Sequence, residues 1–106
     1  MNKGYCECMC GVTMKINGHK IEFKTNEDIF FKEKAGLKPN TARFMNTHED
    51  LEEMKQFYDN FEKTCCGRIT IINAQKPHMK FTRVITDITQ FPGMPMYIIS
   101  WKHKSD

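Results

Sequence analysis

The sequence has no long apolar run and few of the residues that interrupt regular structure. Of its 106 residues, 6 are glycine, 4 are proline and 1 is tryptophan. No stretch approaches the roughly 20 apolar residues that a membrane-spanning helix needs, and an apolar fraction of 40% is ordinary for a globular chain. The first residues also lack a long apolar segment. We therefore expect no signal peptide, no membrane partner and a cytoplasmic location.

Neither sign of charge dominates the chain. It has 16 lysines and arginines against 13 acidic residues, a net charge of +3. This mildly basic balance permits phosphate contacts without requiring them. The length allows one domain with a core that needs neither metal nor disulfides to fold. We expect an N-terminal cysteine-rich arm over residues 1–13 and a single domain over residues 14–106.

Cysteine is absent from the middle of the chain. The five cysteines lie at Cys6, Cys8, Cys10, Cys65 and Cys66. In an extended segment the first three point to one side, so together with Cys65 or Cys66 they form a candidate soft-metal site. Structural zinc sites, however, normally use cysteine pairs separated by two to four residues, which the first three cysteines lack. We therefore expect reduced thiols, no metal site and no cofactor.

Apolar periodicity predicts two helices and at least five strands. Asn17-Gly18 is typical of a tight turn between two short strands, and the apolar positions of the long segment 79–89 change face near Val84-Ile85, which predicts a bulge. The other elements are a helix over 27–35, an amphipathic helix on Leu51, Met54, Phe57, Tyr58 and Phe61, and strands over 40–45, 67–73 and 96–101. The pattern predicts an α+β domain on a curved antiparallel sheet.

One eight-residue stretch, 36–43, gathers polar chemistry. Gly36 suits the end of a helix, and Pro39 pushes Lys38 out of helical geometry. If the chain is extended afterwards, Thr41 and Arg43 share one face, and Lys38 reaches the same place. Such a group suits an anionic or carbonyl-bearing ligand. The alternative interpretation is a capped helix end with solvated charges.

The spacing Gly-x-Lys-x-x-Thr-x-Arg over residues 36–43 resembles the signature of the ASCH domain family, which belongs to the PUA-like superfamily of small β-barrels. The likeness spans about residues 14–103. Most of that family has glutamate where Thr41 stands. Threonine there, with lysine three residues earlier, is similar to the subgroup of bacterial N4-acetylcytidine amidohydrolases. The resemblance implies a small curved antiparallel barrel with two helices.

Three functions follow as hypotheses. The first is a module that binds RNA or a modified nucleoside through Lys38, Thr41 and Arg43, with Arg83 on a basic rim and a partly exposed Trp101 stacking on a base. The second, implied by the resemblance, is an amidohydrolase with Thr41 as nucleophile and Lys38 as its base. The third is a small interaction or inhibitor protein with a protein partner, for which the eight methionines provide adaptable contacts.

The chain departs from the amidohydrolase pattern in one respect. In that subgroup a carboxylate from a segment after the long strand completes the site. Here that segment is the loop 92–95, which contains no aspartate or glutamate. Asp87 and Glu22 are the substitutes that the sequence offers.

Overall fold

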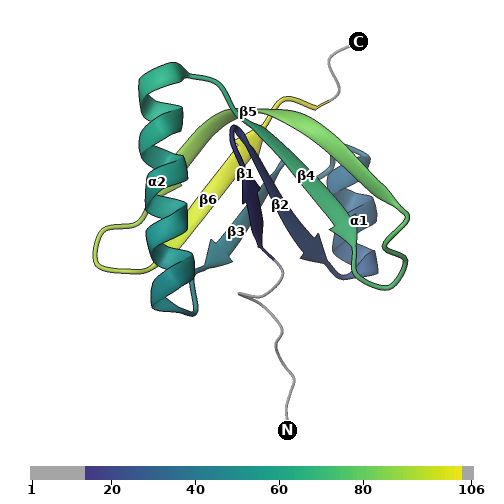
Figure 1. Ribbon diagram of the computed structural model, residues 1–106. Helices are drawn as coiled ribbons and strands as arrows, with labels where there is room; N and C mark the ends of the chain where they lie inside the picture. The colour runs from purple at the N-terminus through teal and green to yellow at the C-terminus, as the bar shows by residue number, and fades with distance from the viewer. Residues whose placement is uncertain (1–13, 104–106) are drawn as a thin grey trace, which may run out of the picture.

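The computed structural model describes residues 14–103, which form two helices and six strands (Figure 1). The predicted N-terminal arm, 1–13, lies outside the described residues. The elements in chain order are β1 (Lys15–Asn17), β2 (Lys20–Thr25), α1 (Glu27–Lys34), β3 (Asn40–Phe44), α2 (His48–Thr64), β4 (Arg68–Asn73), β5 (Lys80–Gln90) and β6 (Met96–Trp101). The α+β class and the two helices are confirmed.

The strands form one mixed sheet in the order β1-β2-β4-β5-β6-β3. All neighbours are antiparallel except β2 and β4, which run parallel with Ile21 beside Ile69. The prediction of an antiparallel sheet is therefore wrong for this pair of strands. The cause is the connection between β2 and β4, because two helices and β3 intervene and bring the chain back in its original direction. The sheet has β1 and β3 as its outer strands, so it is not closed and the predicted barrel is not confirmed.

The first hairpin forms one residue later than the sequence predicts. Asn17 pairs with Lys20, so the two turn residues are Gly18 and His19. Gly18 takes the left-handed backbone, with φ of 65°. Glycine adopts this conformation without the steric cost that a side chain brings, so it occupies the first turn position in place of Asn17.

The predicted bulge in the long strand is confirmed. The pairing of β5 with β6 shifts between Ile85 and Asp87, while β5 continues as one strand. Ile85 and Ile88, which lie three positions apart on either side of this shift, are each 3% exposed. The extra residue changes which positions face the core, as the apolar pattern indicated.

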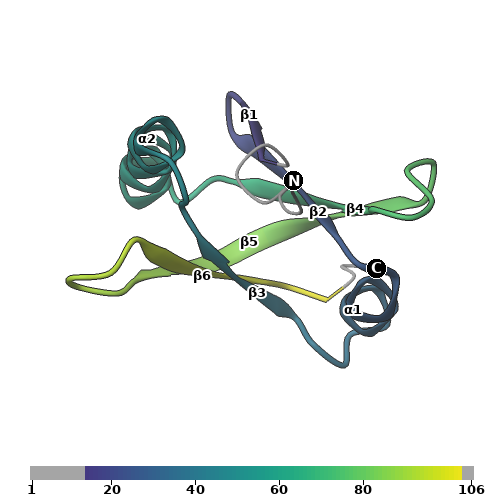
Figure 2. The ribbon, with the colours of Figure 1, turned by 90° about the horizontal axis from the view of Figure 1, so that it is seen from below.

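The two helices lie at opposite ends of the sheet (Figures 1 and 2). Thr47 caps α2 by accepting a hydrogen bond from the Asp50 amide at 3.0 Å, and Asn26 caps α1 in the same way from the Ile29 amide at 3.0 Å. Neither helix of residues 14–103 is both long and apolar enough to cross a membrane.

The core lies between the sheet and the helices. Phe30 from α1 packs on Phe81 from β5, with ring centroids 5.4 Å apart. From α2 the predicted positions Met54, Phe57 and Phe61 are buried, while Leu51 and Tyr58 pack at the margin. The other buried apolar residues are Ile21, Phe23, Met45, Ile69, Ile71, Ile85, Ile88, Tyr97, Ile99 and Trp101.

Candidate functional site

The turn after α1 positions the candidate site. Gly36 has φ of 88°, and the Leu37 amide donates to the Lys32 carbonyl at 3.0 Å. A Cβ on Gly36 would lie 2.9 Å from the His103 ring, so both the backbone conformation and the close packing favour glycine. Pro39 then leads into β3, as the sequence predicts. This turn brings Lys38 back toward the end of α1.

Lys38 binds a buried carboxylate. Its Nζ donates to Glu33 Oε2 at 3.2 Å and to the Asn40 carbonyl at 2.8 Å. The Glu33 side chain has no exposed surface, whereas that of Lys38 is 37% exposed. Glu33 Oε1 is also buried and makes no hydrogen bond within the described residues. The ion pair therefore joins a fully enclosed acid to a cation that reaches the surface.

Thr41 and Arg43 lie on one face of β3, as the alternation predicts. Arg43 Nε donates to Thr41 Oγ1 at 3.0 Å, and its NH1 donates to the Lys24 carbonyl at 3.0 Å. The guanidinium carbon lies 4.7 Å from the centre of the Phe23 ring. Thr41 is only 3% exposed. These contacts fix the guanidinium in one position.

We call Glu33, Lys38, Thr41 and Arg43 the Lys38 cluster. Within it, burial raises the pKa of Glu33 above its ordinary value. Lys38 opposes this rise through its charge and its hydrogen bond, and the charge of Arg43 opposes it further. Glu33 thus interacts electrostatically with both cations. Its burial outweighs their combined effect.

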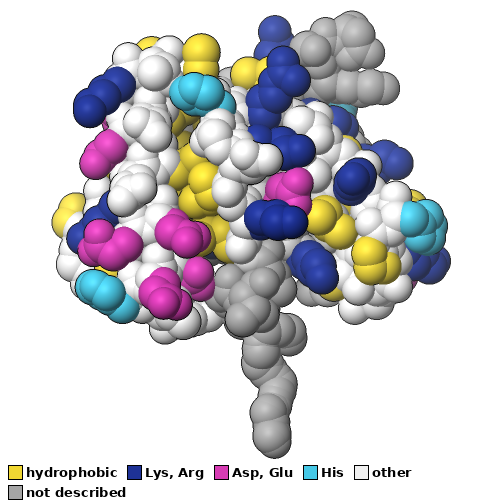
Figure 3. All heavy atoms as spheres, in the orientation of Figure 1, with side chains coloured by type: hydrophobic (Ala, Val, Ile, Leu, Met, Phe, Trp, Pro, Cys, Tyr) yellow, Lys and Arg dark blue, Asp and Glu magenta, His cyan; other side chains and the backbone are white. Residues whose placement is uncertain are grey.

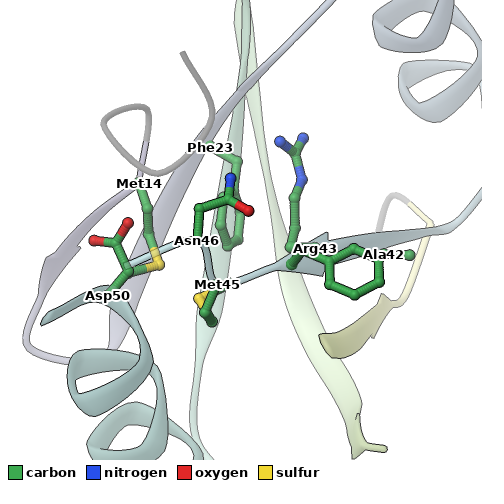
Figure 4. A pocket seen from close by; sticks show the side chains of 8 residues that line it. Met14, Phe23, Ala42, Arg43, Met45, Asn46 and Asp50 are labelled. Atoms are coloured by element: carbon green, nitrogen blue, oxygen red, sulfur yellow. The ribbon is translucent and has the colours of Figure 1, made fainter. Parts of the chain in front are cut away.

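A cavity of about 360 Å³, which we call the Arg43 cavity, opens beside the cluster. In Figure 4, Met14 and Asp50 lie on one side of Phe23 and Arg43 lies on the other, with Asn46 between them in this view. The lining residues are Met14, Phe23, Ala42, Arg43, Phe44, Met45, Asn46 and Asp50. The cavity therefore combines apolar walls with a cation, an amide and a carboxylate. Lys38 and Thr41 do not line it.

Surface charge differs between α2 and the neighbouring strands. Acidic side chains gather over the lower part of α2, and lysines and arginines lie over the strands beside it (Figure 3). Apolar side chains are visible in the hollow between these two regions (Figure 3).

Two of the predicted ligand-binding residues lie elsewhere. Arg83 donates to the Lys34 carbonyl at 3.3 Å and stacks on Phe81, 4.6 Å from the ring centre. Trp101 is 4% exposed and also packs on Phe81, so the expectation of partial exposure is wrong. On β6 the alternate positions 97, 99 and 101 face the core, and the basic tail that follows does not change this alternation.

The proposed substitutes for the missing carboxylate do not join the Lys38 cluster. Asp87 accepts a hydrogen bond from Thr89 at 2.9 Å, and Glu22 pairs with Lys20 at 3.4 Å. The acid beside Lys38 is Glu33, which was not among the predicted site residues. Its spacing of three from the buried Phe30 is the signal that places both on one face of α1.

The structure describes only two of the five cysteines in the predicted soft-metal site, Cys65 and Cys66. Cys65 and Cys66 are exposed free thiols on a second cavity of about 390 Å³, which His19, Lys20 and Arg68 also line. Within residues 14–103, no group of three or more potential ligands is arranged to hold a metal ion. Cys6, Cys8 and Cys10 lie outside the described residues, so the soft-metal alternative stays a prediction.

Comparisons with family models, with curated proteins and with solved structures found no match. The Lys38 cluster and the Arg43 cavity are therefore the features of the described residues that bear on function.

Proposed function

We propose that the protein is a binding module for a nucleobase, presented by a modified nucleoside or by unpaired RNA, and that the base enters the Arg43 cavity. The observation that carries the proposal is the arrangement of a fixed guanidinium beside an apolar cavity with an amide and a carboxylate on its wall. Small-molecule sites commonly have volumes of about 300–1,000 Å³ and apolar walls with a few polar groups. At about 360 Å³ the cavity is within that range.

The wall chemistry suits a base. An unpaired base needs an apolar or guanidinium surface for its ring and hydrogen-bonding groups for its edge. Phe44, which is 51% exposed, supplies aromatic surface. The Asn46 amide both donates and accepts, and the Asp50 carboxylate accepts. An amino or amide edge such as that of cytosine or its N4-acyl derivative matches this pair.

Arg43 is held before any ligand arrives. Thr41, Lys24 and Phe23 each contact its side chain. A side chain that is already ordered loses less conformational entropy on binding, which favours affinity. Burial of Thr41 is consistent with this supporting role, because its hydroxyl accepts from Arg43 and the residue is only 3% exposed.

Calorimetric titration with N4-acetylcytidine tests the proposal. Arg43→Ala should weaken binding about ten- to a hundredfold, since it removes a charged group from the cavity wall. Arg68→Ala is the matched control, because it removes an exposed arginine on β4 that lines the other cavity. Asn46→Ala probes the same wall and keeps Thr41, Lys24 and Phe23 in place around Arg43. Equal affinity in the parent and in both cavity variants would contradict the proposal.

We also propose that the sheet is an open form of the PUA-like barrel that the resemblance implies. The Arg43 guanidinium reaches from the outer strand β3 to the Lys24 carbonyl on β2, which supports this interpretation. Of the residues of the ASCH-like spacing, Arg43 donates to Thr41, and Lys38 donates to Glu33 of the same cluster.

Hydrolysis of an N4-acetylated cytidine is the second candidate. The observation in its favour is Glu33, a carboxylate 3.2 Å from Lys38, in a chain whose loop 92–95 has none. The reaction would require Thr41 to pass its hydroxyl proton to a neutral Lys38. Lys38 instead donates to Glu33 and Asn40, while Thr41 accepts from Arg43. Binding therefore agrees better with the geometry.

Chromatography of cytidine and acetate after incubation with N4-acetylcytidine separates the two candidates. An enzyme should release both products, and Thr41→Ala should abolish the release while Thr89→Ala, an exposed threonine on β5, preserves it. Retention of the intact nucleoside without products would favour the binding module. The interaction-protein hypothesis stays a prediction.

A further inference from the structure

The charged residues of the Lys38 cluster and the Arg43 cavity balance one another. Lys38 and Arg43 are the cations, and Glu33 and Asp50 are the carboxylates. Two positive and two negative groups give a formal net charge of zero. This balance is unexpected in a mildly basic chain if the site were built to attract phosphate, because phosphate sites carry excess positive charge.

Glu33, one of these two carboxylates, is at an unusual position for a charged residue. It has no exposed surface, and its Oε1 lacks a hydrogen-bond partner within the described residues. Enclosing a carboxylate without satisfying both oxygens costs free energy, and a neutral residue of the same size fills the space equally well. Packing therefore gives no reason for an acid here. Its charge, which water screens weakly at a buried position, acts directly on Lys38 and Arg43.

We propose that Glu33 is a specificity-determining residue, which cancels one positive charge beside the Arg43 cavity so that the site prefers an uncharged nucleoside to its phosphorylated form. The inference rests on the proposed nucleoside-binding function. Glu33 does not line the cavity and acts through Lys38, whose side chain is 37% exposed. With the carboxylate present, Lys38 Nζ donates hydrogen bonds to Glu33 and to the Asn40 carbonyl.

Removal of the Glu33 charge should change the ligand that the site favours. Glu33→Gln keeps the volume of the side chain and leaves the site with a net charge of +1. Lys38 then loses its anionic partner, and its partly exposed ammonium adds uncancelled positive charge beside the site. A dianionic phosphate gains attraction from this change, whereas a neutral nucleoside does not.

The test is the ratio of two dissociation constants, for N4-acetylcytidine and for its 5′-monophosphate. Glu33→Gln should shift this ratio about three- to tenfold toward the monophosphate at low salt, and the shift should shrink as salt is added. Glu62→Gln, which makes the same charge change at an exposed position of α2, should leave the ratio unchanged. The double variant Glu33→Gln with Lys38→Met restores neutrality and should return the ratio to the parent value.

The outcomes separate the inference from the function on which it rests. An unchanged ratio in Glu33→Gln with nucleoside binding retained would overturn the inference alone, as would equal weakening of both ligands, which indicates a structural role. A shifted ratio in the double variant would also overturn it, because charge would not be the cause. Failure of the parent protein to bind either ligand would overturn the proposed function, and the inference with it.

Discussion

The two helices bury different kinds of residue. The longer helix, α2, buries Met54, Phe57 and Phe61, all apolar. The shorter helix, α1, buries Phe30 and the carboxylate of Glu33. Both carry acids in the first turn and lysine in the last, and both are capped by a polar side chain. The difference in what they bury therefore does not arise from the N-terminal caps or from the charges of the first and last turns.

This difference bears on where the proposed site lies. The buried face of α2 contributes transfer free energy and packing, as a scaffold helix does. On α1, the buried position of Glu33 contributes less transfer free energy than an apolar residue would, and its carboxylate pairs with Lys38. The turn that follows α1 leads directly to Thr41 and Arg43 on β3. Local departures from favourable packing concentrate at functional sites, which supports the choice of this end of the molecule for the site.

The largest expected effect is on the scaffold helix. Met54→Ala should lower the free energy of unfolding by about 2–5 kcal/mol, because Met54 is fully buried and its removal leaves a cavity. Urea denaturation followed by circular dichroism measures the loss. Leu37→Ala, just beyond α1, is the control, since Leu37 is 80% exposed and should change stability by less than about 0.5 kcal/mol. Similar losses of unfolding free energy in the two variants would show that α2 is not the main source of stability in this comparison.

Sequence predicted the elements that local patterns determine. The three-and-four spacing of apolar residues from Leu51 to Phe61 gave the second helix, and the face change near Val84-Ile85 gave the bulge in β5. The parallel pairing of β2 with β4 was missed because strand pairing depends on the path of the intervening chain, which no single strand encodes.

The site was predicted in part for the same reason. Lys38, Thr41 and Arg43 lie within six residues, so turn chemistry and strand alternation placed them together. Glu33 resembles an ordinary charged position among the acids and lysines of α1, and its burial depends on packing against the sheet. Trp101 was expected near the surface because of its basic neighbours, but alternation along β6 turns it into the core.

The helix caps should have intermediate and equal effects. Thr47→Ala and Asn26→Ala each remove an oxygen that accepts from a backbone amide at 3.0 Å, so each should lower the free energy of unfolding by about 1 kcal/mol. Chemical denaturation of the two variants side by side is the measurement. Thr47→Ser and Asn26→Asp keep a capping oxygen and should stay close to the parent. A much smaller loss at Asn26 would show that the helices differ at their ends as well as in their buried faces.

The smallest expected stability effect concerns Glu33 and depends on pH. Burial raises the pKa of Glu33 in the folded protein above the ordinary value of 4.5, against the opposing charges of Lys38 and Arg43. Between the two pKa values the folded state holds more protons than the unfolded state, so stability falls as pH rises through this range. Below the unfolded pKa the carboxyl is protonated in both states and this loss is absent.

Glu33→Gln removes that titration. We therefore expect the variant and the parent to unfold at similar temperatures near pH 4, and the variant to unfold at the higher temperature near pH 8, in thermal melts at about those values. Glu62→Gln, at an exposed position, should show no such divergence. If Glu33→Gln instead became the less stable protein as pH rises, the ion pair with Lys38 would outweigh burial, and α1 would bury its carboxylate for stability, as α2 buries its apolar residues.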